Sequence, residues 1–378
     1  MTLPEGRRTE ICGVSGASVA VKVLLVSGTL PPHVCGVGDY TGRLTGALSD
    51  EGLDVEVLTT SGPVTAVQSG VRIRARVNGW TPLHVREVAR EIRAVNPDLV
   101  HLQYPTVEYG AGLLPQMLVS IRRPFAVTIH EASIAHVLRK VSLYPFLMLA
   151  DRVISTTRFE ANFMSRMYPP VRDRLSVIPV GSNVPAAATH TRDRSIVYFG
   201  LIAPNKGLED FLRLAELAQK AGASWRFTVI GQTQPRRLAY AEGLRNASHH
   251  LSIEWLPGLP DWEVADRLAR AGAVYLPFPD GASLRRGSLV AALVNGAPVI
   301  TMRGPATPKD IAEDEHIVAF AGSPESAFER AGKILSDSTL ADELSWGARR
   351  YGGNFSWPGI AERHVKLYEE MLGARKQR

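Results

Sequence analysis

The sequence predicts an α/β protein made of two doubly wound domains. Short apolar runs rich in β-branched residues alternate with helical stretches, a pattern typical of a parallel sheet with helices on both faces. The runs form two series along the chain. A chain of 378 residues with 45% hydrophobic residues is also too long for one ordinary α/β core and suits two.

Each series is expected to contribute six short strands. The first series covers residues 21–27, 55–59, 99–103, 125–129, 153–156 and 176–179, and the second covers 196–199, 227–230, 252–255, 274–277, 299–301 and 317–320. Residues 181–194 are mostly polar or small and have no period, so we expect the linker there. We therefore expect a flexible leader over 1–20, a first domain over 21–186 and a second over 187–352. Ligands of such paired sheets bind at the carboxyl ends of the strands, in the cleft between domains.

Composition narrows the class of partner. The net charge of +6 favours anionic partners such as nucleotides, phospholipid headgroups or nucleic acid. Cys12 and Cys35 are the only cysteines and no Cys/His cluster exists, so we expect neither a disulfide framework nor a structural zinc site, which fits a reducing cytoplasm. Residues 1–20 lack a continuous apolar core, and no run approaches the roughly 20 apolar residues that span a bilayer.

Residues 280–300 carry the strongest local signal, because a Gly-Ser step opens an apolar helix. A helix N-terminus leaves backbone N–H groups unpaired and concentrates positive potential. Gly287 and Ser288 are therefore candidates to hold a phosphate, with Arg285 and Arg286 beside them. The alternative is an ordinary strand–loop–helix connection in which the serine is only an N-cap.

A second glycine-containing loop follows the first expected strand, over residues 28–40. Gly36 and Gly38 would let the backbone approach a ligand closely, and the alternative is a simple turn. The loop is not a nicotinamide fingerprint, because Thr41 stands where the third glycine should be. The chain also lacks a Walker-type Gly-Lys-Ser/Thr, a His-Glu-x-x-His and a Gly-x-Ser-x-Gly motif.

Two further candidates lie where expected strands end. His130 and Glu131 close the run 125–131, where a cleft residue would lie, so His130 is a candidate ligand contact. The alternative is a surface or hydrogen-bonded core histidine. Lys206 lies between a strand and a helix, where its ammonium group could neutralise phosphate. Its alternative is a solvated lysine at a helix end.

In this order, the motifs resemble those of the family 4 glycosyltransferases of the GT-B fold. The matching features are Gly36-Val37-Gly38, Thr128-Ile129-His130-Glu131, Val177-Ile178-Pro179-Val180-Gly181, the Gly200 to Gly207 loop with Lys206, Gly296-Ala-Pro-Val-Ile300, and the segments 255–264, 271–277 and 355–368. The resemblance implies two Rossmann-like doubly wound domains facing each other across a cleft. It also implies that residues 353–378 form a helix that packs back on the first domain.

The resemblance further implies an activity. A hexosyltransferase of this family moves a sugar from a nucleotide-sugar donor, held mainly by the second domain, to an acceptor held mainly by the first. It needs no metal or other cofactor, and the outcome implied is retention. Positive groups and helix-end amides offset charge on the departing diphosphate while the sugar passes through an oxocarbenium-like state. The implied catalytic residues are His130, at the sugar, and Lys206. The implied donor-binding residues are Gly36, Gly38, Gly200, Lys206, Arg285, Arg286, Gly287 and Ser288, to which we add Asp280 by the hypothesis below.

Three departures from the family pattern bear on the donor site. The usual pair of glutamates, eight positions apart, falls on Ser283 and Ala291, and neither can replace a carboxylate. The arginine that commonly follows the first glycine of the lysine loop is Leu201 here. We hypothesise that Asp280 supplies a displaced carboxylate and that Arg285 or Arg286 replaces the missing cation.

These departures leave alternatives to the enzyme. One is a catalytically degenerate sugar-nucleotide-binding or partner protein, and a less favoured one is a GT-B sugar-nucleotide epimerase, whose chemistry needs several cleft acids and bases. The acceptor is open among a glycan, a small molecule and a lipid-linked compound, and no specific nucleic-acid binding is expected. Arg122, Arg123 and the segment 137–149 mix cations with an apolar stripe, so we consider a cytoplasmic protein in peripheral contact with the inner face of the membrane. Alternatively, the stripe faces its own sheet.

Overall fold

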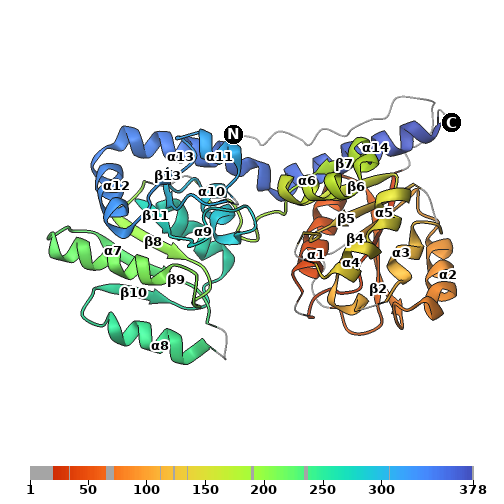
Figure 1. Cartoon of the computed structure of the whole chain (residues 1–378), viewed down its shortest axis with the longest axis horizontal. Helices are drawn as coiled ribbons and strands as arrows, with labels where there is room; N and C mark the ends of the chain where they lie inside the picture. Colours follow the sequence, from red (N-terminus) through yellow and green to blue (C-terminus); the bar gives the residue numbers. More distant parts are fainter. Residues whose placement is uncertain are drawn as a thin grey trace, which may run out of the picture. The chain divides into compact units, whose positions relative to one another are not determined.

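The chain forms two compact units (Figure 1). The computed structural model describes residues 20–376 except 34, 65–71, 111, 122–123, 134, 189–190, 234–236 and 306. The first unit combines Met1–Val180 with Trp357–Arg378, and the second is Gly181–Ser356. The units therefore divide after residues 180 and 356, where the sequence led us to expect 186 and 352. Of the expected leader, residues 1–19 lie outside the described part.

The first unit contains a parallel sheet. Its described strands are β1 (Lys22–Val26), β2 (Asp54–Thr60), β3 (Arg72–Val77), β4 (Leu99–Tyr104), β5 (Phe125–Ile129), β6 (Arg152–Ser155) and β7 (Leu175–Val177). They lie in the order β3-β2-β1-β4-β5-β6-β7, and every neighbouring pair is parallel. The strand order changes direction between β1 and β4, and such a reversal opens a crevice at the carboxyl ends of the strands.

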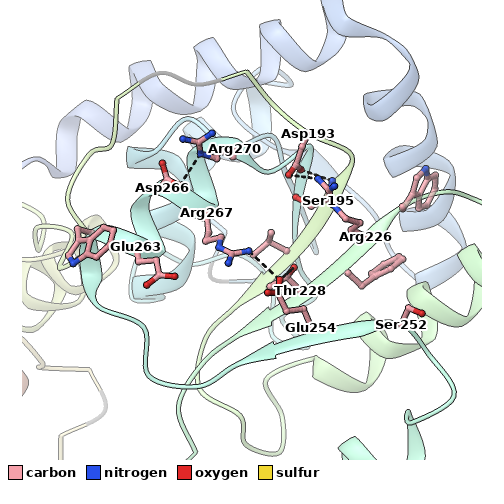
Figure 2. Close-up of a pocket in the computed structure, with 14 residues that line it drawn as sticks. Asp193, Ser195, Arg226, Thr228, Ser252, Glu254, Glu263, Asp266, Arg267 and Arg270 are labelled. Carbon is pink, nitrogen blue, oxygen red and sulfur yellow. Dashed lines mark hydrogen bonds and ion pairs between the residues drawn. The ribbon is translucent and has the colours of Figure 1, made fainter.

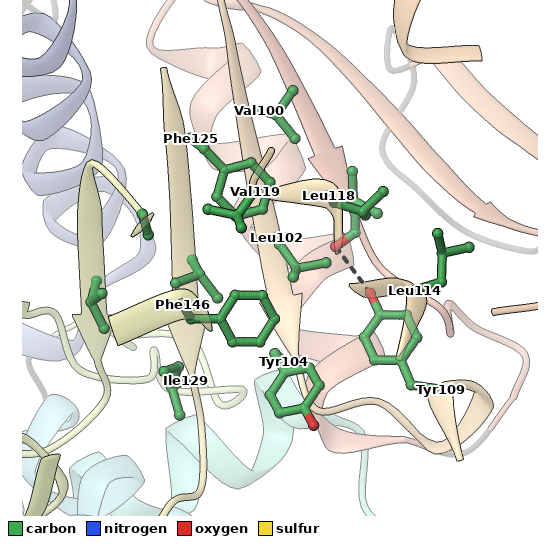
Figure 3. Close-up of a cluster of buried hydrophobic side chains, with 14 of the residues drawn as sticks. Val100, Leu102, Tyr104, Tyr109, Leu114, Leu118, Val119, Phe125, Ile129 and Phe146 are labelled. Carbon is green, nitrogen blue, oxygen red and sulfur yellow. Dashed lines mark hydrogen bonds between the residues drawn. The ribbon is translucent and has the colours of Figure 1, made fainter. Parts of the chain in front are cut away.

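Helices cover both faces of this sheet. They are α1 (Gly36–Asp50), α2 (Val85–Val95), α3 (Leu114–Leu118), α4 (Val137–Ser142), α5 (Tyr144–Leu149), α6 (Arg158–Met167) and α14 (Trp357–Lys376), with 3₁₀ turns at Pro82–His84, Val107–Tyr109 and Pro169–Arg174. Alternate strand residues explain the two covers, since successive side chains point to opposite faces. Leu24 packs in the cluster with α2, α3, α5 and α6, part of which is drawn in Figure 3, whereas Leu25 packs with α1 and α14.

Strand β3 was not predicted from the sequence, because its charged residues, Arg72, Arg74 and Arg76, alternate with apolar ones and do not resemble a buried strand. Its charges are explained by Glu56 of β2, whose side chain is 2% exposed. Arg74 donates to this carboxylate at 2.6 Å and Arg72 at 3.1 Å, while Lys22 lies 3.2 Å away. Burial alone would raise the pKa of Glu56, but the hydrogen bonds and charges of Arg74 and Lys22 outweigh it and lower the pKa. The edge strand β3 is thus attached to β2 through ion pairs as well as through backbone hydrogen bonds.

The second unit contains another parallel sheet. Its described strands are β8 (Ser195–Phe199), β9 (Arg226–Ile230), β10 (Ile253–Leu256), β11 (Ala273–Leu276), β12 (Val299–Thr301) and β13 (Ala319–Phe320), in the order β10-β9-β8-β11-β12-β13. Its helices are α7 (Leu208–Lys220), α8 (Leu238–Ala247), α9 (Asp261–Arg270), α10 (Gly287–Val294), α11 (Lys309–Glu313), α12 (Pro324–Ser336) and α13 (Ser338–Gly352), followed by a 3₁₀ turn at Gly353–Phe355. One apolar cluster holds α7 and α12 on the sheet, and another holds α9 and α10. The predicted fold class, two doubly wound α/β domains, is confirmed.

Helix α10 begins at the predicted Gly-Ser step. Its residues from Leu289 to Val294 are all buried, whereas Gly287 is exposed and Ser288 is half-buried. The apolar body of the helix therefore anchors it in the core and leaves its first turn accessible. No helix among the described residues is long and apolar enough to cross a membrane.

Candidate functional site

In the first unit, the loop after β1 leads into α1 at Gly36. A Cβ added to Gly36 would meet no described atom within 4 Å, so a ligand can approach its backbone. Gly38 differs, because it is buried and an added Cβ would lie 2.9 Å from the carbonyl oxygen of Thr29. The close approach at Gly38 is therefore made by the unit's own loop. Beside the segment from Gly28 to His33, the structure has a small cavity of about 160 Å³.

His130 follows β5 at the carboxyl edge of the sheet. Its backbone N–H donates to the carbonyl of Tyr104 at 2.9 Å, and its ring Nε2 lies 3.1 Å from Oε1 of Gln103. The ring of Tyr40 packs edge-on against it, with centroids 4.9 Å apart. Burial lowers the pKa of His130 to about 3, with a smaller contribution from His364. His130 is thus a neutral hydrogen-bonding group at neutral pH, and Glu131 beside it is exposed.

Behind His130 lies a group of buried polar residues that our sequence analysis did not select. His101 and Gln103 of β4 are both 0% exposed, and so is His364 of α14. The signal in the sequence was the position of His101 and Gln103 inside an otherwise apolar strand, where each needs an internal hydrogen bond. Because α14 comes from the far end of the chain, the contact between α14 and β4 could not be read locally.

In the second unit, Lys206 lies in the loop between β8 and α7. Its side chain is half-buried, and its ammonium group contacts no acceptor among the described residues. Tyr198 holds the loop by donating from its hydroxyl to the carbonyl of Lys206 at 3.1 Å. Two glycines shape the loop. An added Cβ at Gly207, whose φ is +78°, would lie 1.8 Å from the carbonyl oxygen of Pro277. Gly200 donates its amide to Ile230 at 3.0 Å.

The loop from Asp280 to Gly287 follows β11, and the Lys206 loop follows the neighbouring strand β8. The two loops are close, because a Cβ added to Gly207 would meet Pro277, three residues before Asp280. Arg286 forms an ion pair with Asp280, and its guanidinium group lies 4.7 Å from the ring centroid of Phe278. Arg286 is also the N-cap residue of α10, but its side chain does not cap the helix. A Cβ added at Gly287 would meet no described atom within 4 Å. The amides of this first turn are therefore accessible to an anion.

The positions that depart from the family pattern are placed as follows. Ser283 is 9% exposed, and its hydroxyl accepts from the amide of Arg285 at 3.3 Å. Ala291 is 1% exposed within α10 and packs in the apolar core. Leu201 is 47% exposed on the glycine loop. Asp280 is therefore the carboxylate that this loop offers, and it is already paired with Arg286.

A cavity of the second unit lies away from these candidate residues. It measures about 870 Å³ and is bounded by α9 and by strands β8, β9 and β10 (Figure 2). Its arginines are paired, Arg226 with Asp193 and Arg267 with Glu254. None of the candidate residues named from the sequence lines it. The candidate donor residues instead lie at the carboxyl ends of β8 and β11, the edge where doubly wound sheets bind ligands.

Two doubly wound parallel sheets, each with a glycine-containing loop at its carboxyl edge, are the architecture of the GT-B fold. Residues 34–184 match the family model described as Glycosyltransferase Family 4, and residues 193–337 match that described as Glycosyl transferases group 1. Together these matches span most of both units. The chain belongs to the family 4-like GT-B glycosyltransferases.

Individual relatives agree with this assignment. The chain is 23% identical to a D-inositol 3-phosphate glycosyltransferase of Acidothermus cellulolyticus, over 92% of this chain and 90% of the relative. It is 22% identical to the protein of the same name from Nocardia farcinica, over 89% of this chain and 85% of that relative. In fold it is similar to sucrose-phosphate synthase from Thermosynechococcus elongatus, with a TM-score of 0.65 and 19% identity over 94% of this chain and 100% of that protein. It is likewise similar to Anabaena HepE in complex with UDP and glucose, with a TM-score of 0.64, 14% identity and coverage of 93% and 100%.

Proposed function

We propose that this chain transfers a sugar from a nucleotide-sugar donor to a hydroxylated acceptor, with retention of the anomeric configuration and without a metal. The observation that carries the proposal is the pairing, at one edge of the second sheet, of an uncapped helix start with a lysine that has no ion-pair partner in the described part of the chain. The amides of Gly287 and Ser288 and the Nζ of Lys206 would hold the donor diphosphate. Anabaena HepE, a structural neighbour, is described in complex with UDP-glucose.

The chemistry of this arrangement is electrostatic. As the bond between the sugar and the diphosphate breaks, negative charge grows on the departing oxygen, and fixed positive groups stabilise it. Lys206 supplies a full charge, and the first turn of α10 supplies oriented amides. His130, neutral and held at the edge of the first sheet, would accept or donate a hydrogen bond to the sugar. Gly200 and Gly36 would allow close approach of the donor to the backbone.

We propose that Asp280 takes the place of one missing glutamate. Its carboxylate would accept hydrogen bonds from the sugar hydroxyls, and Arg286 would orient it through their ion pair. Arg285, exposed beside them, would assist at the diphosphate. The residues at positions 283 and 291 favour a second candidate, a protein that binds a nucleotide sugar without turning it over.

Two measurements separate these functions. Release of nucleoside diphosphate from a panel of nucleotide sugars supports the enzyme, whereas saturable binding without release supports the binding protein. Lys206→Ala should weaken nucleoside-diphosphate binding by roughly 10- to 100-fold, since a charged hydrogen bond contributes about 1.5 to 3 kcal/mol. Nucleoside binding should change little, and Lys220→Ala at the exposed end of α7 is the matched control. Equal losses for nucleoside and diphosphate would contradict the assignment.

The names of the relatives suggest the first acceptor to test. Two of them are named for D-inositol 3-phosphate, and both align over most of this chain. We propose a hydroxylated small molecule of this class as acceptor. Donor consumption that rises when D-inositol 3-phosphate is added, with a new glycosylated product detected by mass spectrometry, would support it. Consumption unaffected by this compound would direct the search to glycans or lipid-linked acceptors.

We also propose that the protein acts in the cytoplasm in peripheral contact with an anionic membrane, through α4 and α5. As in the alternative that the stripe faces its own sheet, Leu143, Phe146 and Leu147 pack in the core of the first unit. Helix α4, in contrast, buries no residue. The apolar side chains exposed on the two helices include Val137 at 66%, Leu138 at 74% and Met148 at 52%. Basic residues Arg139 and Lys140 lie among them. A surface that combines exposed apolar groups with cations suits an interfacial helix.

Sedimentation with vesicles tests this contact. The protein should bind vesicles containing anionic lipid at low salt and be released at high salt. Exchange of Leu138 and Met148 for serine should abolish binding, whereas exchange of Leu238, which is 52% exposed in the second unit, should not. Failure to bind at low salt would remove the membrane proposal. Arg122 and Arg123, which entered our sequence-based expectation, lie outside the described residues.

A further inference from the structure

A chain of hydrogen bonds runs from His130 into the core of the first unit. Oε1 of Gln103 lies 3.1 Å from Nε2 of His130, and Nε2 of Gln103 lies 3.2 Å from Nε2 of His101. Nδ1 of His101 lies 2.6 Å from the hydroxyl of Tyr368 on α14. Thr128 adds its hydroxyl at 2.8 Å from Nε2 of His101. The residues behind His130 are all 1% exposed or less, so water does not compete for these bonds.

The carboxamide of Gln103 sets the direction of the chain, because its oxygen only accepts and its nitrogen only donates. With the oxygen facing His130, Nε2 of His130 must carry the proton. With the nitrogen facing His101, Nε2 of His101 must hold a lone pair, and its Nδ1–H then donates to the oxygen of Tyr368. With the carboxamide in this orientation, the contacts from His130 to Tyr368 each join one donor to one acceptor, and the Thr128 hydroxyl shares the Nε2 lone pair of His101 with Gln103.

The arrangement fixes what His130 offers a ligand. A neutral imidazole has one N–H and one lone pair, so protonation at Nε2 leaves the lone pair on Nδ1. Nδ1 has no hydrogen-bond partner among the described residues. The edge-on contact with Tyr40 further restricts ring rotation. His130 is therefore prepared as an acceptor, which suits a hydroxyl group better than an anionic oxygen.

We infer that Gln103 is a positioning residue, which holds His130 as the Nε2–H tautomer and so makes its Nδ1 the acceptor for a hydroxyl of the donor sugar. The inference deepens the proposed function and rests on it for the identity of the ligand. A donor whose sugar lacks that hydroxyl would leave Nδ1 without a partner. Gln103 thus contributes to sugar selectivity without touching the sugar.

Nitrogen NMR of the full-length chain labelled with ¹⁵N-histidine tests the inference without any donor. The signals of His130 are assigned by their loss in His130→Asn. We expect a protonated Nε2 and an unprotonated Nδ1 in the wild type, and a shift towards a tautomer mixture in Gln103→Met. Gln116→Met is the matched control, because Gln116 is also a buried glutamine of this unit and donates to Tyr104, not to this chain. Gln103→Glu keeps an oxygen facing His130 and should retain the wild-type tautomer.

Kinetics supply the second readout. Gln103→Met should lower kcat/KM for the donor about tenfold, as for the loss of one ordinary hydrogen bond, with thermal unfolding close to that of Gln116→Met. A wild-type His130 protonated at Nδ1, or an unchanged spectrum in Gln103→Met, would overturn the inference. If the wild type releases no nucleoside diphosphate from any donor, the proposed function fails, while the spectra still decide whether Gln103 sets the tautomer.

Discussion

Acidification should destabilise the first unit through His364, a histidine buried without a full set of hydrogen bonds. Its Nδ1–H donates to the carbonyl of Ile360 at 2.8 Å, so its Nε2 holds the lone pair. That nitrogen is buried and has no partner among the described residues. Burial lowers the pKa of His364 from 6.5 to about 4, although the carbonyl of Ile360 acts in the opposite direction.

The sign and size of the effect follow from proton linkage. Between pH 6.5 and about 4, the unfolded chain binds a proton at His364 that the folded chain does not. The free energy of unfolding therefore falls as the pH falls through this window. At about 1.36 kcal/mol per pH unit, the loss between pH 6.5 and pH 5 is about 2 kcal/mol for this residue.

Hydrogen exchange on the full chain measures this loss within the first unit. Protection of the β4 and β5 amides, corrected for intrinsic exchange, should fall between pH 7 and pH 5 in the wild type. In His364→Leu, which removes the unpaired nitrogen, the fall should be smaller by about 2 kcal/mol. The exposed His33 provides the control, as His33→Leu should behave like the wild type. An equal pH dependence in His364→Leu and wild type would refute the reasoning.

Three further predictions follow from the site and the sheet edge. Gly38→Ala should lower the Tm, because its Cβ would lie 2.9 Å from a loop carbonyl oxygen and overpacking costs about 1 to 3 kcal/mol. Gly36→Ala should keep the wild-type Tm and weaken donor binding, because a Cβ there meets no described atom. Equal Tm values for the two variants would contradict this difference. Glu56→Gln should lower the free energy of unfolding in urea by about 3 kcal/mol, since it breaks a buried ion-pair group, and an unchanged midpoint would contradict that role. Asp280→Asn should lower kcat/KM for the nucleotide sugar about tenfold while nucleoside-diphosphate binding stays within twofold, and a parallel loss of both would place Asp280 away from the sugar.

The sequence could predict those parts of the fold that depend on local pattern. Most of the strand runs are largely apolar because helices cover both faces of the sheets, and each expected strand overlaps an observed one. Strand β3 was missed, since its charged residues make sense only against Glu56 on the neighbouring strand. The start of α10 was predictable from a glycine and a serine that precede a wholly apolar segment.

The candidate site was only partly predictable. Lys206 and Gly287 are marked by their neighbours in sequence, and the structure leaves both accessible. Gly38 looked the same as Gly36 in sequence, and only the position of the preceding loop distinguishes them. Gln103 became visible through its contacts with His130 and His101, which depend on strand pairing and on the packing of a distant helix. Side chains that act through non-local neighbours leave no pattern in the sequence.

A crystal structure with a nucleoside diphosphate tests the central claim most directly. The account predicts that the diphosphate lies within hydrogen-bond distance of the amides of Gly287 and Ser288 and of the Nζ of Lys206. A diphosphate bound in the ion-paired cavity beside α9, or anywhere distant from both the lysine and the start of α10, would contradict it.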